Sequence, residues 1–318
     1  MNDIAPSESQ TPGESNAPHA TTDSPPPVAR TLVAGVLMGL ANLVPGISGG
    51  TMVVIMGLYD RFVSSIADVT RLTFRRGQVM FLVMLAIAAI IAIGAGAGTL
   101  RDLVTFHRME MFSLFIGMTL GGVPLLVRML GDQRGIAIVG GVIGLALMTL
   151  VAVNQAERPD RESIKEALAA GELVVESDYG RDVVAGVLGM SAMILPGISG
   201  AYMLLIIGRY EAILTAISTC KAFVTSGGSE GDISLAVAIL APVCFGAAGG
   251  IILLSNALKW MLREKKDLTI GLLLGILCGS VIGIWPFDAD STSGNYLLGA
   301  GLTLAGFLST VLLGRLGR

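Results

Sequence analysis

Residues 42–51, NLVPGISGGT, decide how this sequence folds, because a stretch that breaks helices lies inside an apolar segment. The chain has 318 residues, of which 53% are hydrophobic and only 14% are charged, and its mean hydropathy is +0.75. Apolar runs near 20 residues indicate transmembrane helices, whereas the strands of a membrane barrel alternate over about 10 residues. We therefore predict an all-α polytopic membrane protein in which residues 42–51 interrupt a helix.

The interrupted segment occurs twice in the chain. Residues 30–66 align without a gap to residues 181–217, and 17 of the 37 positions are identical, including both PGISG blocks. A repeat of this length indicates two halves built in the same way. Each copy is followed by three more apolar segments, at 79–98, 111–129 and 136–153 in the first half and at 233–258, 268–284 and 296–314 in the second.

The repeat divides the chain into four parts. Residues 1–28 are rich in Ser, Thr, Pro and acidic residues, so we expect a disordered cytoplasmic tail. The first membrane repeat is expected at 29–153 and the second at 181–318. Residues 154–180 are polar and form the expected extracytoplasmic linker between them.

The placement of lysine and arginine predicts how the interrupted segments meet the membrane. If they re-enter on the side from which they came, each half crosses three times and the two halves are inverted. One side then carries 13 of the 21 basic residues, including the clusters at 61–76 and 259–266. If both segments crossed, these clusters would lie on opposite sides. Because basic residues concentrate in cytoplasmic loops, we predict two inverted repeats, each a re-entrant helical hairpin plus about three transmembrane helices, with both termini cytoplasmic.

A helix that stops inside a membrane leaves backbone groups that need polar partners. Pro45 and Gly46 are expected to form the turn, and Ser48 is expected to cap the half-helix that follows. The first amides of a half-helix carry the positive end of its dipole, which favours an anion. Two inverted hairpins would bring two such ends toward each other, so we expect an anion site where they meet.

The candidate site residues come from both copies, and the first copy is the more polar, since Asn42 and Thr51 correspond to Met193 and Tyr202. The residues expected to bind the anion are Asn42, Pro45, Gly46, Ser48, Gly49, Gly50 and Thr51 in the first copy, and Pro196, Gly197, Ser199, Gly200 and Tyr202 in the second. The residues that are candidates for capturing it at the hairpin bases are Arg30, Arg61, Arg181 and Arg209.

Other small or polar residues have structural explanations. The glycines at 94–98 and 246–250 are typical of closely packed helices. Asn256 and Glu110 lie at span ends, where we expect a solvated interface. The cysteines and histidines neither cluster nor show the spacing of metal ligands, so we expect no metal and no cofactor.

The hairpin sequences at 39–66 and 193–214 resemble the paired signatures of the DUF368 family, and the resemblance covers nearly all of the chain after the tail. The resemblance implies a multi-pass protein of the bacterial cytoplasmic membrane that translocates undecaprenyl phosphate. Such a protein returns this lipid carrier from the outer to the inner leaflet for cell-envelope synthesis. The implied partners are the lipid and the membrane; no nucleic acid is expected, and the oligomeric state stays open. No GxxxxGK(S/T) nucleotide-binding motif is present, so we expect transport to be passive or driven by a coupling proton or ion.

Two other functions remain open from the sequence. A membrane phosphatase acting on undecaprenyl pyrophosphate also has inverted repeats and a PGxSRSxxT motif, but Gly49 and Gly200 stand at the arginine position of that motif. Without an arginine and paired glutamates, phosphoryl transfer lacks charge stabilisation and proton handling. An ion-coupled transporter of a small soluble anion would use the same hairpins.

Overall fold

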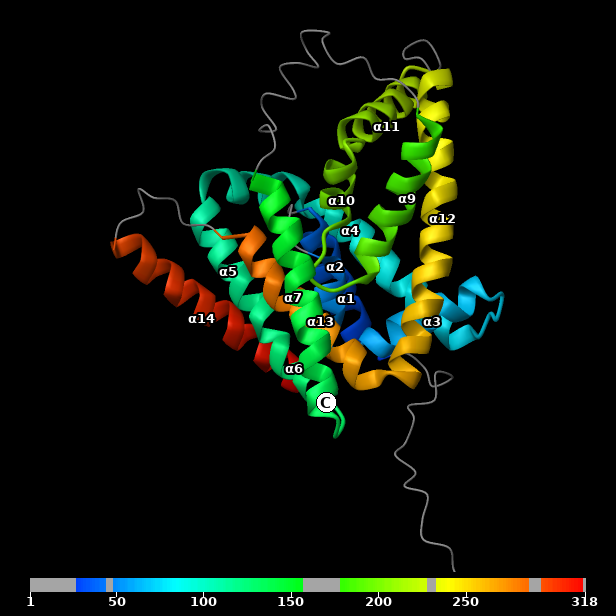
Figure 1. The fold of residues 1–318 in the computed structure, drawn as a ribbon. Helices are drawn as coiled ribbons and strands as arrows, with labels where there is room; N and C mark the ends of the chain where they lie inside the picture. Colours follow the sequence, from blue (N-terminus) through cyan, green and yellow to red (C-terminus); the bar gives the residue numbers. More distant parts are fainter. Residues whose placement is uncertain (1–26, 44–47, 157–177, 228–232, 286–292, 317–318) are drawn as a thin grey trace, which may run out of the picture.

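The computed structural model describes residues 27–43, 48–156, 178–227, 233–285 and 293–316, and over these residues the regular structure is helical (Figure 1). The helices of the first half are α1 (Val28–Asn42), α2 (Gly49–Ile55), α3 (Tyr59–Thr70), α4 (Arg76–Phe106), α5 (Arg108–Gly121), α6 (Val123–Val127) and α7 (Arg134–Ala156). Those of the second half are α9 (Tyr179–Ile194), α10 (Gly200–Ile207), α11 (Tyr210–Thr225), α12 (Ile233–Glu264), α13 (Lys266–Gly283) and α14 (Ser293–Leu316).

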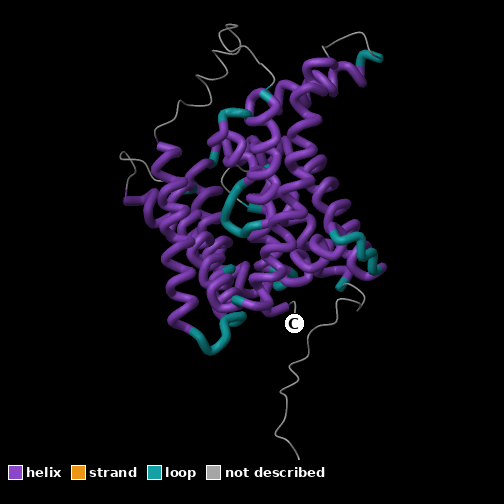
Figure 2. The backbone as a smooth tube through the Cα atoms, turned by 45° about the vertical axis from the view of Figure 1, so that its right-hand side comes forward, coloured by secondary structure: helices purple, strands orange, loops and turns teal. Residues whose placement is uncertain are grey.

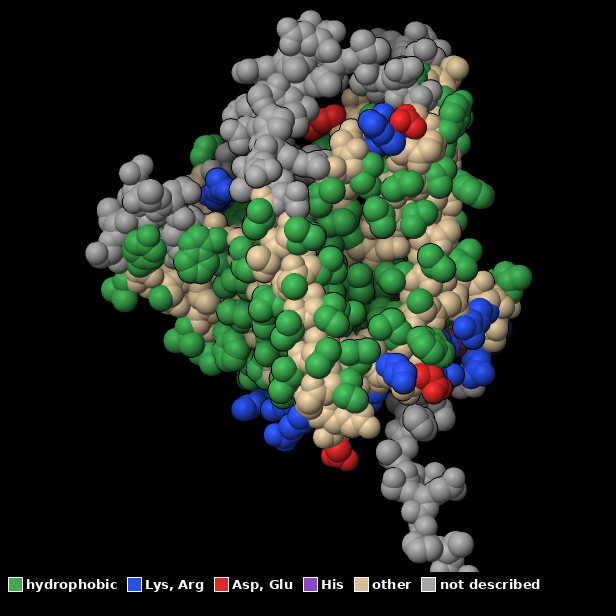
Figure 3. All heavy atoms as spheres, in the orientation of Figure 1, with side chains coloured by type: hydrophobic (Ala, Val, Ile, Leu, Met, Phe, Trp, Pro, Cys, Tyr) green, Lys and Arg blue, Asp and Glu red, His purple; other side chains and the backbone are tan. Residues whose placement is uncertain are grey.

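Six helical segments are long and apolar enough to cross a membrane, and they coincide with the six apolar segments of the sequence. They are Arg76–Gly96, Arg108–Val127, Arg134–Val153, Ile233–Glu264, Lys266–Gly283 and Tyr296–Arg315. In Figure 3 a broad band of hydrophobic side chains separates charged side chains at the two ends of the molecule. The chain is therefore a multi-pass membrane protein, as predicted.

The predicted interruption is confirmed in both halves. Helix α1 ends at Asn42 and α2 begins at Gly49, and α9 ends at Ile194 before α10 begins at Gly200. The second helix of each pair has seven and eight residues, about 12 Å at 1.5 Å per residue, against a hydrocarbon core of about 30 Å. Figure 2 shows the loop that joins α9 to α10 in the middle of the bundle. Re-entry of the hairpins and inversion of the halves stay predictions.

Two kinds of helix packing hold the bundle together. Within each half the first helix packs against the long one, α1 on α4 and α9 on α12; between the halves α5 packs on α14 and α7 on α13. A Cβ added to Gly246 would lie 2.1 Å from the carbonyl oxygen of Val183, and one added to Gly275 would lie 2.0 Å from that of Gly141. Close helix packing, which we expected for residues 246–250, is therefore what Gly246 provides.

The two densest basic clusters lie at the same end of the molecule. Helix α3 packs against α12, and the contact joins residues 68–71 to residues 256–259. This adjacency is what inverted halves require. The linker contributes its first three residues to α7 and its last two to α9. Residues 1–26 of the tail and 157–177 of the linker lie outside the described residues.

Candidate functional site

The second broken helix, α9, ends in the middle of the bundle, where its last carbonyl groups need hydrogen-bond donors. Tyr59 Oη donates to the carbonyl oxygen of Ile194 at 3.3 Å, and Ser48 Oγ donates to that of Leu195 at 2.9 Å. Both donors belong to the first half of the chain. The first hairpin therefore supplies the polar partners that water cannot supply at this depth.

The turn after α9 is held by a third bond from the first hairpin. The backbone N–H of Gly197 donates to Thr51 Oγ1 at 2.9 Å. Gly197 has a φ of +90°, and a Cβ at this position would lie 3.0 Å from the carbonyl oxygen of Ile276, so the turn requires glycine. Together with the two carbonyl bonds, this contact shows that the two hairpins meet.

Ser48 does not play the part expected of it in α2. It occupies the N-cap position, but its side chain makes no capping hydrogen bond. Its hydroxyl proton goes instead to Leu195, because the end of α9 presents a carbonyl group there. The prediction that Ser48 caps its own helix is wrong, since tertiary contact with the second hairpin determines the direction of this hydroxyl group.

Asn42 lies against the first residue of α2. A Cβ added to Gly49 would be 2.8 Å from Asn42 Oδ1, and Asn42 is nevertheless exposed. At the equivalent place in the second half, a Cβ on Gly200 would be 2.6 Å from Met193 Cγ. The structure therefore puts the amide of Asn42 and the thioether of Met193 in matching positions, each beside the start of a half-helix.

Most of the predicted site residues are buried around this meeting point. The buried ones are Ser48, Gly49, Gly50, Thr51, Pro196, Gly197, Ser199 and Gly200. Gly50 faces the end of α9, where a Cβ would lie 3.1 to 3.3 Å from three carbonyl oxygens. Pro45 and Gly46 lie outside the described residues, as does the side chain of Tyr202. The arrangement offers hydroxyl groups, glycine amides and one exposed amide side chain, all of which can bind an oxyanion.

Three of the four candidate arginines have different partners. Arg30 Nε donates to the carbonyl oxygen of Met56, so this side chain fastens the turn between α2 and α3. The guanidinium group of Arg61 lies 5.3 Å from the ring centre of Phe81. Arg181, which the repeat matches to Arg30, is 72% exposed and pairs with Asp178 at 3.3 Å.

Arg209 is committed to a buried ion pair with Asp182, which the sequence analysis missed. Arg209 Nε and Nη2 donate to the two carboxylate oxygens at 2.6 and 2.9 Å, and the Asp182 side chain has no exposed surface. This bidentate pair joins the start of α9 to the start of α11. A signal was present, because Asp182 places a charge where the first copy has Thr31.

Comparison with known proteins gives consistent matches. The sequence model of the VCA0040-like family, described as undecaprenyl phosphate translocase-like, matches residues 38–296. A polyprenyl-phosphate transporter of Vibrio cholerae serotype O1 (strain ATCC 39315 / El Tor Inaba N16961) is 27% identical over 269 residues, which cover 81% of this chain and 77% of the relative. A polyprenyl-phosphate transporter of Staphylococcus aureus (strain NCTC 8325 / PS 47) is 26% identical over 291 residues, 90% of this chain and 95% of the relative. No solved structure matches the chain.

Proposed function

Because this chain belongs to the VCA0040-like family of undecaprenyl phosphate translocase-like proteins, we propose that it carries undecaprenyl phosphate across the bacterial cytoplasmic membrane. Net movement runs from the outer to the inner leaflet, so that the carrier lipid returns to envelope synthesis. Both termini lie in the cytoplasm, and the end of the bundle that carries the basic clusters at 61–76 and 259–266 faces the cytoplasm. The movement is passive or driven by a proton or ion gradient, since the sequence carries no GxxxxGK(S/T) nucleotide-binding motif.

The observation that carries this proposal is the meeting of two broken helices inside a bundle of six membrane spans. The phosphate head of the lipid cannot cross hydrocarbon without polar partners, whereas its isoprenoid tail can remain in the bilayer. Ser48 and Thr51 already form hydrogen bonds at the meeting point. In the loaded protein their hydroxyl groups and the amides of Gly49 and Gly50 turn to the phosphate head.

The two hairpins then serve the two leaflets. Asn42, the exposed amide beside α2, receives the head in the first hairpin, and Ser199 and Gly200 receive it in the second. Arg30 and Arg181 attract phosphate at the hairpin bases. Arg209 contributes indirectly, because its pairing with Asp182 fixes the start of α11 to the start of α9.

Two alternatives are less well supported. The matched relatives are named transporters rather than phosphatases, and a phosphatase motif would require arginine where Gly49 and Gly200 stand. A transporter of a small soluble anion would share the hairpins and their chemistry, but the matched relatives are named for a polyprenyl phosphate rather than for a soluble anion.

The proposal is tested with purified protein in liposomes that contain labelled undecaprenyl phosphate. We expect the label to change leaflets without release of inorganic phosphate. Released phosphate would support the phosphatase, and accumulation of a soluble anion with no lipid movement would support the second alternative.

A pair of matched variants locates the site. Asn42→Met gives the first hairpin the residue of the second, and we expect about tenfold slower transfer because a polar partner of the head is lost. The control is Met193→Ile, a volume-conserving exchange at the equivalent position. Equal transfer rates in the two variants would refute a binding role for Asn42.

A further inference from the structure

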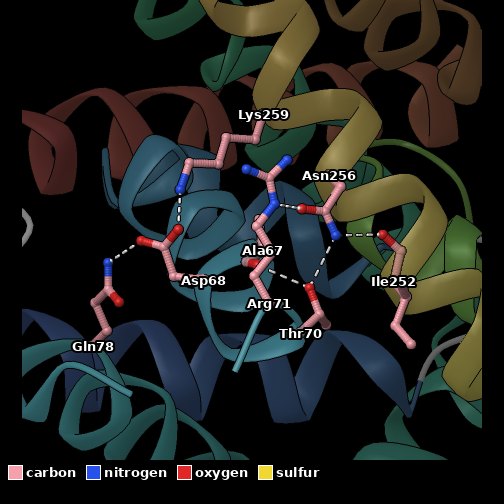
Figure 4. A network of polar contacts seen from close by, with 8 residues as sticks. All are labelled: Ala67, Asp68, Thr70, Arg71, Gln78, Ile252, Asn256 and Lys259. Carbon is pink, nitrogen blue, oxygen red and sulfur yellow. Dashed lines mark hydrogen bonds and ion pairs between the residues drawn. The ribbon is translucent and has the colours of Figure 1, made fainter. Parts of the chain in front are cut away.

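A polar contact between α3 and α12 joins the two halves at the basic end of the molecule (Figure 4). Lys259 forms an ion pair with Asp68, and the two side chains are only 8% and 15% exposed. Gln78 Nε2, on α4, donates to the other carboxylate oxygen of Asp68 at 2.6 Å. One carboxylate thus connects three helices from both halves.

A second set of hydrogen bonds extends the α3–α12 contact. Arg71 donates through Nε to Asn256 Oδ1, and Asn256 Nδ2 donates to Thr70 Oγ1 at 3.0 Å. Asn256, which was expected at a solvated span end, is partly exposed and also faces α3, because the packing of α3 across α12 brings polar partners to it. Every one of these bonds has to break if α3 is to move away from α12.

The α3–α12 contact has no equivalent at the other end of the described structure. The matching contact would join α11 to α4, but the main partners of α11 are α12 and α10 in its own half. The repeat places Thr219 and Ala222 at the positions of Asp68 and Arg71, so the carboxylate and the guanidinium group are missing as well. Inverted-repeat transporters close around their site on one side at a time. The α3–α12 contact is positioned to close the basic end of the molecule.

The chemistry around Asp68 is also that of a phosphate site. Lys259 and Gln78 donate to its two oxygens, and Arg75 adds electrostatic attraction. Burial raises the pKa of the Asp68 carboxyl, but the two hydrogen bonds and the two cations lower it by more, so that the pKa lies below its usual value. Cations and an amide that converge on two oxygens of one anion will also accept a phosphate, which carries more negative charge than a carboxylate.

We propose that Lys259 binds phosphate at the basic end of the molecule, and that the Asp68 carboxylate occupies the place of the phosphate while this end is closed. The inference rests on the proposed function, since the ligand is the phosphate monoester of a polyprenyl lipid. When the phosphate head leaves the hairpins toward this end, it displaces the Asp68 carboxylate from Lys259. Helix α3 then separates from α12, and the site opens to this leaflet.

Two substitutions that break the same ion pair separate phosphate binding from closure. Asp68→Asn frees Lys259, whereas Lys259→Gln removes the cation. We expect Lys259→Gln to slow leaflet transfer about tenfold, the factor of one charge-assisted hydrogen bond, and Asp68→Asn to slow it less than threefold. Lys259→Arg retains the positive charge, so we expect leaflet transfer near the normal rate. Equal losses in Asp68→Asn and Lys259→Gln, with both proteins monodisperse in detergent, would overturn the binding role.

Closure itself is tested with a reversible thiol cross-linker. Thr70→Cys and Asn256→Cys are combined in a protein whose Cys220, Cys244 and Cys278, all free thiols, are replaced by serine. We expect cross-linking to stop transfer and reduction to restore it, while each single-cysteine protein treated in the same way sets the baseline. Full transfer in a completely cross-linked protein would overturn the gate.

The ligand is tested by the rate of this cross-linking in liposomes. Undecaprenyl phosphate is expected to lower the rate several-fold, whereas undecaprenol, which lacks the phosphate, leaves it unchanged. Equal effects of the two lipids would overturn displacement by phosphate. If the wild-type protein moves no lipid, while undecaprenyl phosphate still lowers the cross-linking rate of the double-cysteine protein, the proposed function is refuted but the gate is kept.

Discussion

The two hairpins share a backbone pattern but are fastened by different chemistry. In the first, Arg30 donates to the carbonyl oxygen of Met56, and Thr31 and Leu58 occupy the positions that in the second hairpin form the buried pair of Asp182 and Arg209. The repeat therefore preserves where the chain turns, but it does not preserve the groups that hold each turn.

We call α1–α3 the first arm and α9–α11 the second arm, and the two arms are attached to the rest of the molecule in different ways. The second arm is tied internally, because the buried ion pair joins α9 to α11. The first arm is tied across the molecule, because Asp68 and Arg71 on α3 bond to α12 of the other half. We infer that the first arm is the one that moves.

The largest effect is expected at the buried ion pair. Asp182→Asn leaves the Arg209 charge buried without a countercharge, which costs about 3–5 kcal/mol in the free energy of unfolding. Thr31→Val, at the matching position, should change it by less than about 1 kcal/mol, since the buried Thr31 hydroxyl has no hydrogen-bond partner in the described structure. Denaturant titration in mixed micelles measures both. Similar values at the two positions would contradict the asymmetry.

A smaller effect is expected at the glycines that begin the two half-helices. In Gly200→Ala the new Cβ lies 2.7 Å from the carbonyl oxygen of Gly189, a backbone atom, and we expect a loss of about 2–3 kcal/mol. In Gly49→Ala the contacts are side-chain atoms of Asn42 and Met38, which can move. Its thermal midpoint should therefore fall less, while its leaflet transfer slows because Asn42 is displaced. A larger stability loss in Gly49→Ala would count against this comparison.

The bond between the hairpins is expected to contribute less again. Thr51→Val leaves the buried N–H of Gly197 without its acceptor, which costs about 1–2 kcal/mol. Thr51→Ser keeps the hydroxyl group and is the matched control. If both substitutions lower the thermal midpoint equally, the loss comes from packing rather than from the hydrogen bond.

The smallest effect is expected from pH at the α3–α12 contact. Because the pKa of Asp68 is lowered in the folded protein, its contribution is fully present above the unfolded pKa of about 3.9 and is lost as pH falls through the folded value. Spin labels at Thr73→Cys and Arg263→Cys should report one distance from pH 8 to pH 5. They should separate only in stronger acid, and separation near pH 6 would contradict this assignment.

Several elements were predictable from local sequence. The six spans follow from apolar length, and the two interruptions follow from Pro196, Gly197 and their matching residues in the first copy. The meeting of the hairpins was expected from the repeat. What the repeat did not indicate is that the hydroxyl of Ser48 serves Leu195 rather than its own helix, because a hydroxyl group rotates toward whichever acceptor tertiary packing presents.

The sequence by itself determined that this chain spans a membrane several times, that two helices break, and that one basic cluster follows the first hairpin while the other follows the first long apolar segment of the second half, because hydrophobic length, proline and charge act locally. Only the tertiary structure decided which polar groups pair. Tyr59 with Ile194, Asp182 with Arg209 and Asp68 with Lys259 are separated by 27 to 191 residues. The pairing of Asp182 with Arg209 depends on how two helices of the second half pack, and the other two pairings depend on how the halves pack on each other. Low-dielectric surroundings make each pairing matter.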